Sequence, residues 1–104
     1  MKTTTLTDTN ANAAAFLEKL TAEYSSYKDT NIIVDLSVQE GLQLSDVLGF
    51  LSLSDKHRKS KKSFVLVVTD FDIDDAPEEL IIVPTLQEAH DVIEMEEIER
   101  DLGF

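Results

Sequence analysis

Three short apolar runs interrupt a mostly polar chain, at residues 32–36, 64–68 and 80–83. The first two are rich in β-branched residues, which is typical of strands that are covered on both faces. The third run is followed by Pro84, which has no backbone N–H to offer a neighbouring strand and therefore ends it. The pattern predicts three buried strands.

Three other segments carry apolar residues at spacings of three and four, which is the period of a helix with one buried face. The first begins near residue 11, the second near residue 44, and the third at residue 86. Each has a residue type that commonly caps a helix end. The candidate caps are Asn10 or Asn12, Ser45, Thr85 with Glu88 in a capping box, and Gly103 at the C-terminal end.

The predicted order is α–β–α–β–β–α, and strands that alternate with helices favour parallel pairing. We therefore expect an α/β fold with a small mixed or mostly parallel sheet of three to four strands and helices packed on it. Residues 1–9 are polar and rich in Thr, so they are expected to form a flexible N-terminal segment. Residues 10–104 are expected to form a single domain.

The chain has no cysteine and a formal net charge of −12, which disfavours nucleic acid and anionic membranes as partners. No apolar run is long enough to span a bilayer, and the N-terminus lacks the apolar core of a secretory signal, so a cytoplasmic location is expected. The charged residues are unevenly distributed, and one segment of this acidic chain is basic. This basic cluster comprises Lys56, Arg58, Lys59, Lys61 and Lys62, and is interpreted as the solvated end of the second helix, with a phosphate-binding patch as the alternative.

No arrangement of residues predicts an enzyme, a metal site or a cofactor. The acidic segment from Asp70 to Asp75 lacks the Gly and Glu that a calcium loop needs at its sixth and twelfth positions, so a solvated loop is expected. His90 and Glu94 are four residues apart and are expected to pair on a helix surface. His57 lies among cations, which disfavours metal binding.

Three blocks, in their order and spacing, resemble the STAS family, whose members include anti-sigma factor antagonists and the cytoplasmic tails of sulfate transporters. They are NIIVDLS (31–37), LSDVLGFL (44–51) and VPTLQEAHDVI (83–93), and the spacing from Asp35 to the strand SFVLV (63–67) is also similar to that of the family. The resemblance covers roughly residues 8–98. The resemblance implies a non-catalytic protein–protein interaction domain, an anti-sigma factor antagonist-like regulator. Its partner would be an anti-sigma factor or a serine kinase-like protein.

The chain departs from this family in two places. Members usually open with a β-hairpin, whereas the segment before residue 11 is short, so a shortened hairpin is expected. Members also carry Asp-Ser-Ser/Thr-Gly where this chain has Gln43-Leu44-Ser45-Asp46. The resemblance still implies Ser45 as a candidate phosphorylation site. The implied partner-binding residues are Gln43, Leu44, Ser45, Asp46 and Gly49, next to the turn at residues 38–43.

Two alternatives stay open from the sequence. Ser45 can be a plain helix cap with no regulatory role. The protein can also be a structural accessory subunit or a homodimerising adaptor with no phosphorylation switch. In that second alternative the shortened N-terminal sheet edge and the exposed end of the last helix pair with another chain. The helix is implicated because Met95, Ile98, Leu102 and Phe104 cannot all face one small core.

Overall fold

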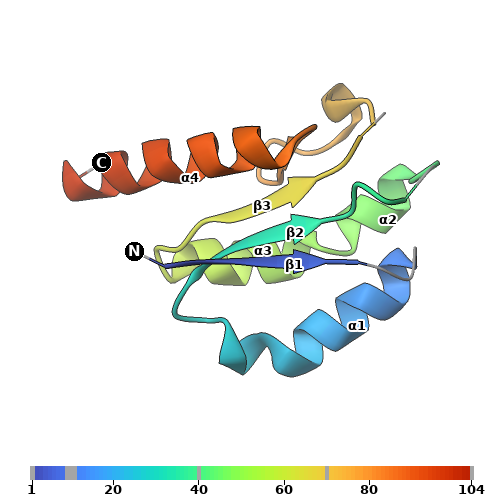
Figure 1. Cartoon of the computed structure of the whole chain (residues 1–104), viewed down its shortest axis with the longest axis horizontal. Coiled ribbons are helices and arrows are strands. Elements are labelled where there is room, and N and C mark those ends of the chain that lie inside the picture. Colours follow the sequence, from blue (N-terminus) through green and yellow to red (C-terminus); the bar gives the residue numbers. More distant parts are fainter. Residues whose placement is uncertain (1, 9–11, 40, 70, 104) are drawn as a thin grey trace.

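The computed structural model describes residues 2–8, 12–39, 41–69 and 71–103, which are built around a four-stranded sheet (Figure 1). Every neighbouring pair of strands is parallel, and the order in the sheet follows the order in the chain. The predicted α/β fold is thus confirmed, including the parallel pairing of the two central apolar runs. The strands are β1 (Thr3–Thr7), β2 (Asn31–Asp35), β3 (Phe64–Val67) and β4 (Ile81–Val83).

Helices cover both faces of the sheet. One face is covered by α1 (Ala13–Glu23), the 3₁₀ turn η1 (Tyr24–Ser26), α2 (Leu44–Leu48) and α3 (Leu51–Lys59). The opposite face is covered by α4 (Leu86–Asp101), as Figure 1 shows, and the short turn η2 (Ile73–Asp75) lies between β3 and β4. Across the described ranges, no helix has the length and apolar character needed to cross a membrane.

Alternate strand residues supply two separate hydrophobic cores. In β2, Ile32 and Val34 face α1, α2 and α3, whereas Ile33 faces α4. The smaller core, on the α4 side, also contains Ala89 and Ile93. Because β2 and β3 are buried along their whole length, both of their faces must be apolar. This explains their nearly continuous apolar sequences.

The N-terminal segment forms strand β1, so the predicted flexible segment is wrong for residues 3–7. Four of its five residues are Thr, which hides the apolar signal, although Thr is favourable in strands. Leu6 packs against the larger core. Because β1 pairs parallel to β2, a single parallel edge strand stands where a shortened hairpin was expected.

The second predicted helix is divided into α2 and α3 by Gly49 and Phe50. The Phe50 side chain is completely buried in the larger core, which fixes the junction between the two helices. Hydrophobic periodicity continues across this junction, so the break has no signal in the local sequence.

Three predicted helix ends are confirmed. The Asn12 side chain accepts a hydrogen bond from Ala15 N at 3.1 Å at the start of α1. Thr85 Oγ1 accepts one from Glu88 N at 3.1 Å at the start of α4. Just past the end of α4, Gly103 has a left-handed φ of 85°, which glycine adopts at little cost.

Candidate protein-binding site

Helix α2 lies at the end of the sheet where the strands finish, and it exposes apolar side chains there (Figure 1). Leu44 and Leu48, four residues apart on this helix, are each 37% exposed. Val38, in the turn that leads from β2, is 51% exposed. We refer to Val38, Leu44 and Leu48, together with the exposed Gln43 and Ser45, as the α2 surface.

The start of α2 is capped by Asp46 rather than by Ser45. The Asp46 carboxylate accepts a hydrogen bond from Gln43 N at 2.9 Å, so Gln43 is the N-cap residue and Ser45 is the second residue of the helix. The prediction that Ser45 caps this helix is therefore wrong. The Ser45 side chain is exposed to solvent. Because Asp46 caps the helix, the Ser45 hydroxyl is not needed for capping.

The turn before α2 is held by buried polar groups. Asp35 Oδ1 accepts a hydrogen bond from Ser37 N at 2.9 Å, and the Gln39 amide donates to the Asp8 carboxylate. Asp8 also accepts from Asn12 N at 3.1 Å, which connects the turn to the start of α1. Because these groups are buried and hydrogen-bonded, the turn that carries Val38 is held in one conformation.

Gly49, one of the predicted partner-binding residues, contacts helix α1. A Cβ atom at this position would lie 3.0 Å from Leu17 Cδ2 and 3.4 Å from the carbonyl oxygen of Asp46. The backbone φ of −58° is ordinary, so the requirement for glycine is one of space. The structure thus places Gly49 against Leu17 of α1, although the residue itself is exposed, as are Gln43, Leu44 and Ser45, whereas Asp46 is half-buried.

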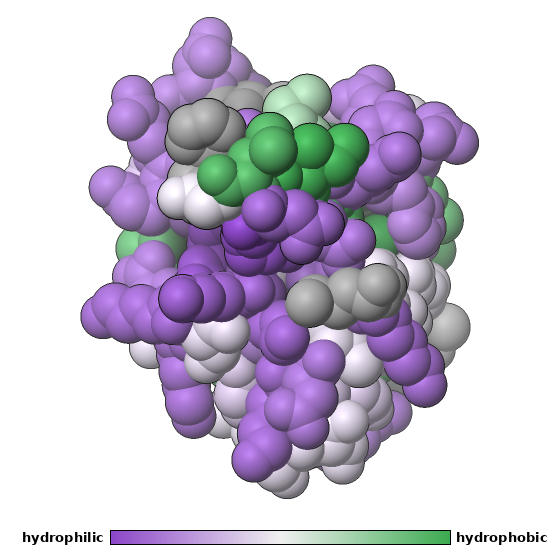
Figure 2. All heavy atoms as spheres, turned by 90° about the vertical axis from the view of Figure 1, so that its left-hand side faces the viewer, coloured by the Kyte–Doolittle hydropathy of each residue, from purple (hydrophilic) through white to green (hydrophobic). Residues whose placement is uncertain are grey.

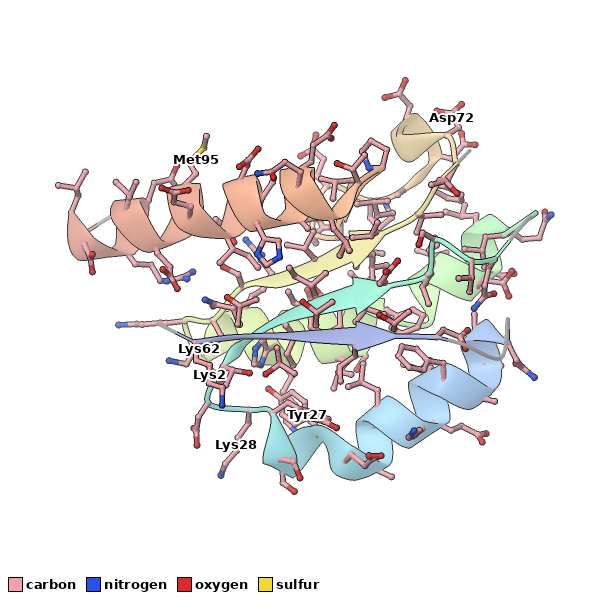
Figure 3. All side chains as sticks on the ribbon, viewed as in Figure 1. Lys2, Tyr27, Lys28, Lys62, Asp72 and Met95 are labelled. Atoms are coloured by element: carbon pink, nitrogen blue, oxygen red, sulfur yellow. The ribbon has the colours of Figure 1, made fainter. Side chains whose placement is uncertain are left out.

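The basic cluster coincides with the end of α3, as predicted. Lys56, Arg58 and Lys59 lie in the last turn, and Lys61 adopts a left-handed φ of 63° just beyond it. Arg58 pairs with Glu96 of α4 at 2.6 Å. Figure 3 shows that Lys62 lies at the same end of the molecule as Lys2, away from α2. Cations therefore gather at the opposite end of the sheet from the α2 surface.

A buried polar network under α4 was missed by the sequence analysis. Ser63 Oγ donates to Glu96 Oε1 at 2.6 Å and accepts from Arg100 at 3.1 Å. Asn31 donates to Glu97 at 2.6 Å, and its side-chain oxygen accepts from Ser63 N at 2.8 Å. The network ties the starts of β2 and β3 to the second half of α4. The local signal of it is that Glu96, Glu97 and Arg100 follow the buried Ile93 at spacings of three and four, so they continue the sheet-facing side of α4 with polar residues.

Glu96 is the centre of this network. Burial alone would raise its pKa, but hydrogen bonds from Arg58 and Ser63, together with the charges of Arg58 and Arg100, hold the pKa below its usual value. Glu96 is therefore ionised at neutral pH and binds α3, β3 and α4 together.

His57 is completely buried, although its neighbours in the sequence are the cations of the basic cluster. Its Nε2 lies 2.7 Å from the carbonyl oxygen of Thr30, which can only accept, so Nε2 carries the hydrogen. Nδ1 consequently accepts a hydrogen bond from the Tyr24 hydroxyl at 2.7 Å. With both nitrogens occupied inside the fold, this histidine has a structural role.

The other candidate sites find little support. In the described ranges no group of three or more His, Cys, Asp or Glu side chains could hold a metal ion. The side chain of Asp72 accepts from Asp74 N at 3.1 Å, which shapes the acidic loop, and Asp70 lies outside the described residues. The predicted His90–Glu94 pair is not formed: both residues lie in the described part of the chain, and no salt bridge joins them there, whereas Arg58 pairs with Glu96.

Comparison of the sequence with protein-family models and with curated proteins finds no match.

Proposed function

We propose that this protein is a non-catalytic protein–protein interaction domain that binds its partner through the α2 surface. The observation that carries the proposal is the exposure of three apolar side chains there, Val38 at 51% and Leu44 and Leu48 at 37% each. Leu44 and Leu48 share one side of α2, and Val38 lies in the turn after β2, at the same end of the sheet; exposed apolar side chains of this kind commonly mark protein interaction sites. The hydrogen-bonded turn beneath them reduces the entropy that binding would otherwise cost.

The more specific proposal is an anti-sigma factor antagonist-like regulator controlled by phosphorylation of Ser45. It rests on the resemblance of the three sequence blocks, in their order and spacing, to the STAS family. It is also supported by the position of Ser45 next to Leu44, with its side chain exposed. A phosphate added there would place about two negative charges in an apolar contact surface and would weaken binding. The parallel strand β1, in place of an opening hairpin, is where the fold differs from the family pattern.

The test is a quantitative affinity purification with the purified domain as bait, comparing wild type with Leu48→Gln. Leu86→Gln is the matched control, because Leu86 has a similar exposure of 40% but lies at the start of α4. We expect at least one protein to be retained by wild type and by Leu86→Gln but lost with Leu48→Gln. Identical sets of retained proteins for all three baits would contradict the proposal.

Ser45→Asp tests the switch in the same experiment. Loss of the partner with Ser45→Asp, but not with Ser45→Ala, would support control by phosphorylation. A partner retained equally by both variants would indicate constitutive binding. Mass spectrometry of the protein after incubation with a cognate serine kinase provides the direct measurement, and an unmodified Ser45 would end the phosphorylation proposal.

A second candidate function is a structural accessory subunit or homodimer that pairs through β1. The observation in its favour is that β1 lies at the edge of the four-stranded sheet, where a strand of another chain can add by backbone hydrogen bonds. Light scattering after size exclusion distinguishes the two candidates. A stable dimer without any partner favours this second function, and a monomer favours the α2 surface.

A further inference from the structure

Helix α4 carries an apolar stripe on the side that faces away from the sheet. Met95, Ile98 and Leu102 are 62%, 53% and 68% exposed, and their spacings of three and four residues place them on one side of the helix. The sheet-facing side is occupied instead by Ala89 and Ile93, which are buried. Figure 3 shows Met95 directed away from the sheet, and Figure 2 shows apolar atoms bordered by hydrophilic ones at this end of the molecule.

Carboxylates border this stripe on both sides. At 3.6 residues per turn, Glu94 and Asp101 fall along one side of the stripe and Glu99 along the other, and all three are exposed. The helix contains one Lys or Arg, Arg100. Its guanidinium donates to Ser63 Oγ at 3.1 Å and lies 3.5 Å from Asn31 Oδ1, both at the sheet. Among the residues of α4 itself, the stripe is therefore bordered by carboxylates. Lys61 and Lys62, from the turn after α3, line surface hollows together with Glu99 and Asp101.

This charge pattern selects the kind of partner. Two copies of α4 packed along their stripes, in either direction, would bring the bordering carboxylates of the two helices against one another, and the net charge of −12 on each chain adds to this repulsion. Arg100 cannot relieve this repulsion without leaving the buried Ser63 and Asn31. A helical segment with its own apolar stripe bordered by Lys or Arg would instead cover the apolar side chains and pair with the carboxylates beside them.

We propose that the stripe Met95, Ile98 and Leu102 is a second protein-binding surface, and that it binds a basic amphipathic helix of another protein rather than a second copy of this chain. The surface lies on the opposite face of the sheet from α2. The proposal is therefore independent of binding at the α2 surface, and one can fail without the other.

The test uses a fluorescein-labelled helical peptide of leucine and lysine, with the leucines at spacings of three and four. Fluorescence anisotropy at physiological ionic strength measures its affinity for the full chain. A peptide of the same composition in a permuted order, which forms no apolar face, controls for attraction to the overall charge of −12. A third peptide carries glutamate in place of lysine. We expect the amphipathic lysine peptide to bind at least about tenfold more tightly than either control peptide.

The decisive variant is Ile98→Gln, which removes apolar surface without changing charge and, at 53% exposure, leaves the fold intact. We expect it to weaken binding of the lysine peptide at least about tenfold. Met95→Gln provides an independent second variant, and circular dichroism verifies that both are folded. Leu48→Gln, in the α2 surface, should leave the peptide affinity unchanged. Amide chemical shifts should change at residues 94–102.

Three results would overturn the proposal. The first is equal peptide affinity of wild type, Ile98→Gln and Met95→Gln, because binding would then be electrostatic only. The second is peptide binding that is lost with Leu48→Gln but kept with Ile98→Gln, which would assign the peptide to the α2 surface. The third is a homodimer, measured by light scattering, that Ile98→Gln dissociates, since the occupant would then be a second copy.

Discussion

The Tyr24 hydroxyl lies 2.7 Å from Nδ1 of His57, inside the larger core and with the two rings in an edge-on arrangement. The second nitrogen of His57 donates to the Thr30 carbonyl oxygen at 2.7 Å. Burial lowers the pKa of His57 more than the hydrogen bond to Thr30 raises it, and the charges of Lys62 and Arg58 lower it further. The folded protein therefore keeps this histidine neutral, with η1 joined to α3 through it.

We predict that the free energy of unfolding decreases as the pH falls below about 6.5, the pKa of an unfolded-state histidine. Below this pH, His57 of the unfolded chain binds a proton, whereas His57 of the folded chain stays neutral until the pH reaches its lower folded-state pKa. Stability therefore rises with pH across this window, by up to about 1.4 kcal/mol per pH unit. Urea denaturation at several pH values measures the slope.

The matched control for this prediction is His90→Gln, because His90 is exposed on α4. It should keep the slope, whereas His57→Gln should flatten it. An unchanged slope in His57→Gln would show that other groups cause the effect. Glu96 affects stability in a separate pH range. Because its pKa is lowered in the folded protein, its contribution to the free energy of unfolding is complete above about pH 4.3 and is lost only as the pH falls below that value.

The second prediction contrasts two serines that are both completely buried. Ser63→Ala removes the hydroxyl that links Glu96 to Arg100, so it should lower the free energy of unfolding by about 1–3 kcal/mol. Ser54 Oγ is a buried atom for which the described part of the structure offers no hydrogen-bond partner. Ser54→Ala, inside helix α3, should therefore raise the free energy of unfolding by about 0.5–1.5 kcal/mol. Denaturation curves of the two variants test the pair, and a loss of stability in Ser54→Ala would contradict this account.

The third prediction concerns the start of α2. Asp46→Ala removes the acceptor for Gln43 N and should lower the free energy of unfolding by about 1 kcal/mol. Ser45→Ala should change it by less than about 0.5 kcal/mol, because the Ser45 side chain is exposed and is not the cap. The opposite ranking of the two variants in thermal or urea denaturation would restore Ser45 as the cap.

The fourth prediction tests the contact between Gly49 and Leu17. Gly49→Ala should raise the free energy of unfolding by about 0.4–1 kcal/mol, because the unfolded chain loses entropy. This gain is opposed by crowding, because the new Cβ would lie 3.0 Å from Leu17 Cδ2, which must move away. In a Leu17→Ala background the obstruction is gone, so the same substitution should be stabilising by the full amount. A double-mutant cycle measures this coupling. Additive effects of the two substitutions would show that space is not the reason for glycine here.

Local sequence patterns determine several features of this protein. The two central strands, their parallel pairing, the caps at Asn12 and Thr85 and the end at Gly103 were all predictable. They depend on burial periodicity and on hydrogen bonds between residues three or four apart, which a single segment encodes. The exposed stripe on α4 was predictable for the same reason, because one helix offers only one face to a core.

Tertiary contacts decided the rest. Strand β1 exists because β2 offers it a backbone partner, although its threonines carry little apolar signal. Phe50 separates α2 from α3 because the larger core accepts its ring at that point. His57 is buried among cations because Tyr24 and Thr30 occupy both of its nitrogens. The network of Ser63, Glu96 and Arg100 joins residues more than thirty positions apart. No local propensity specifies which distant groups will meet, so their roles emerged only when the sheet and its helices were assembled.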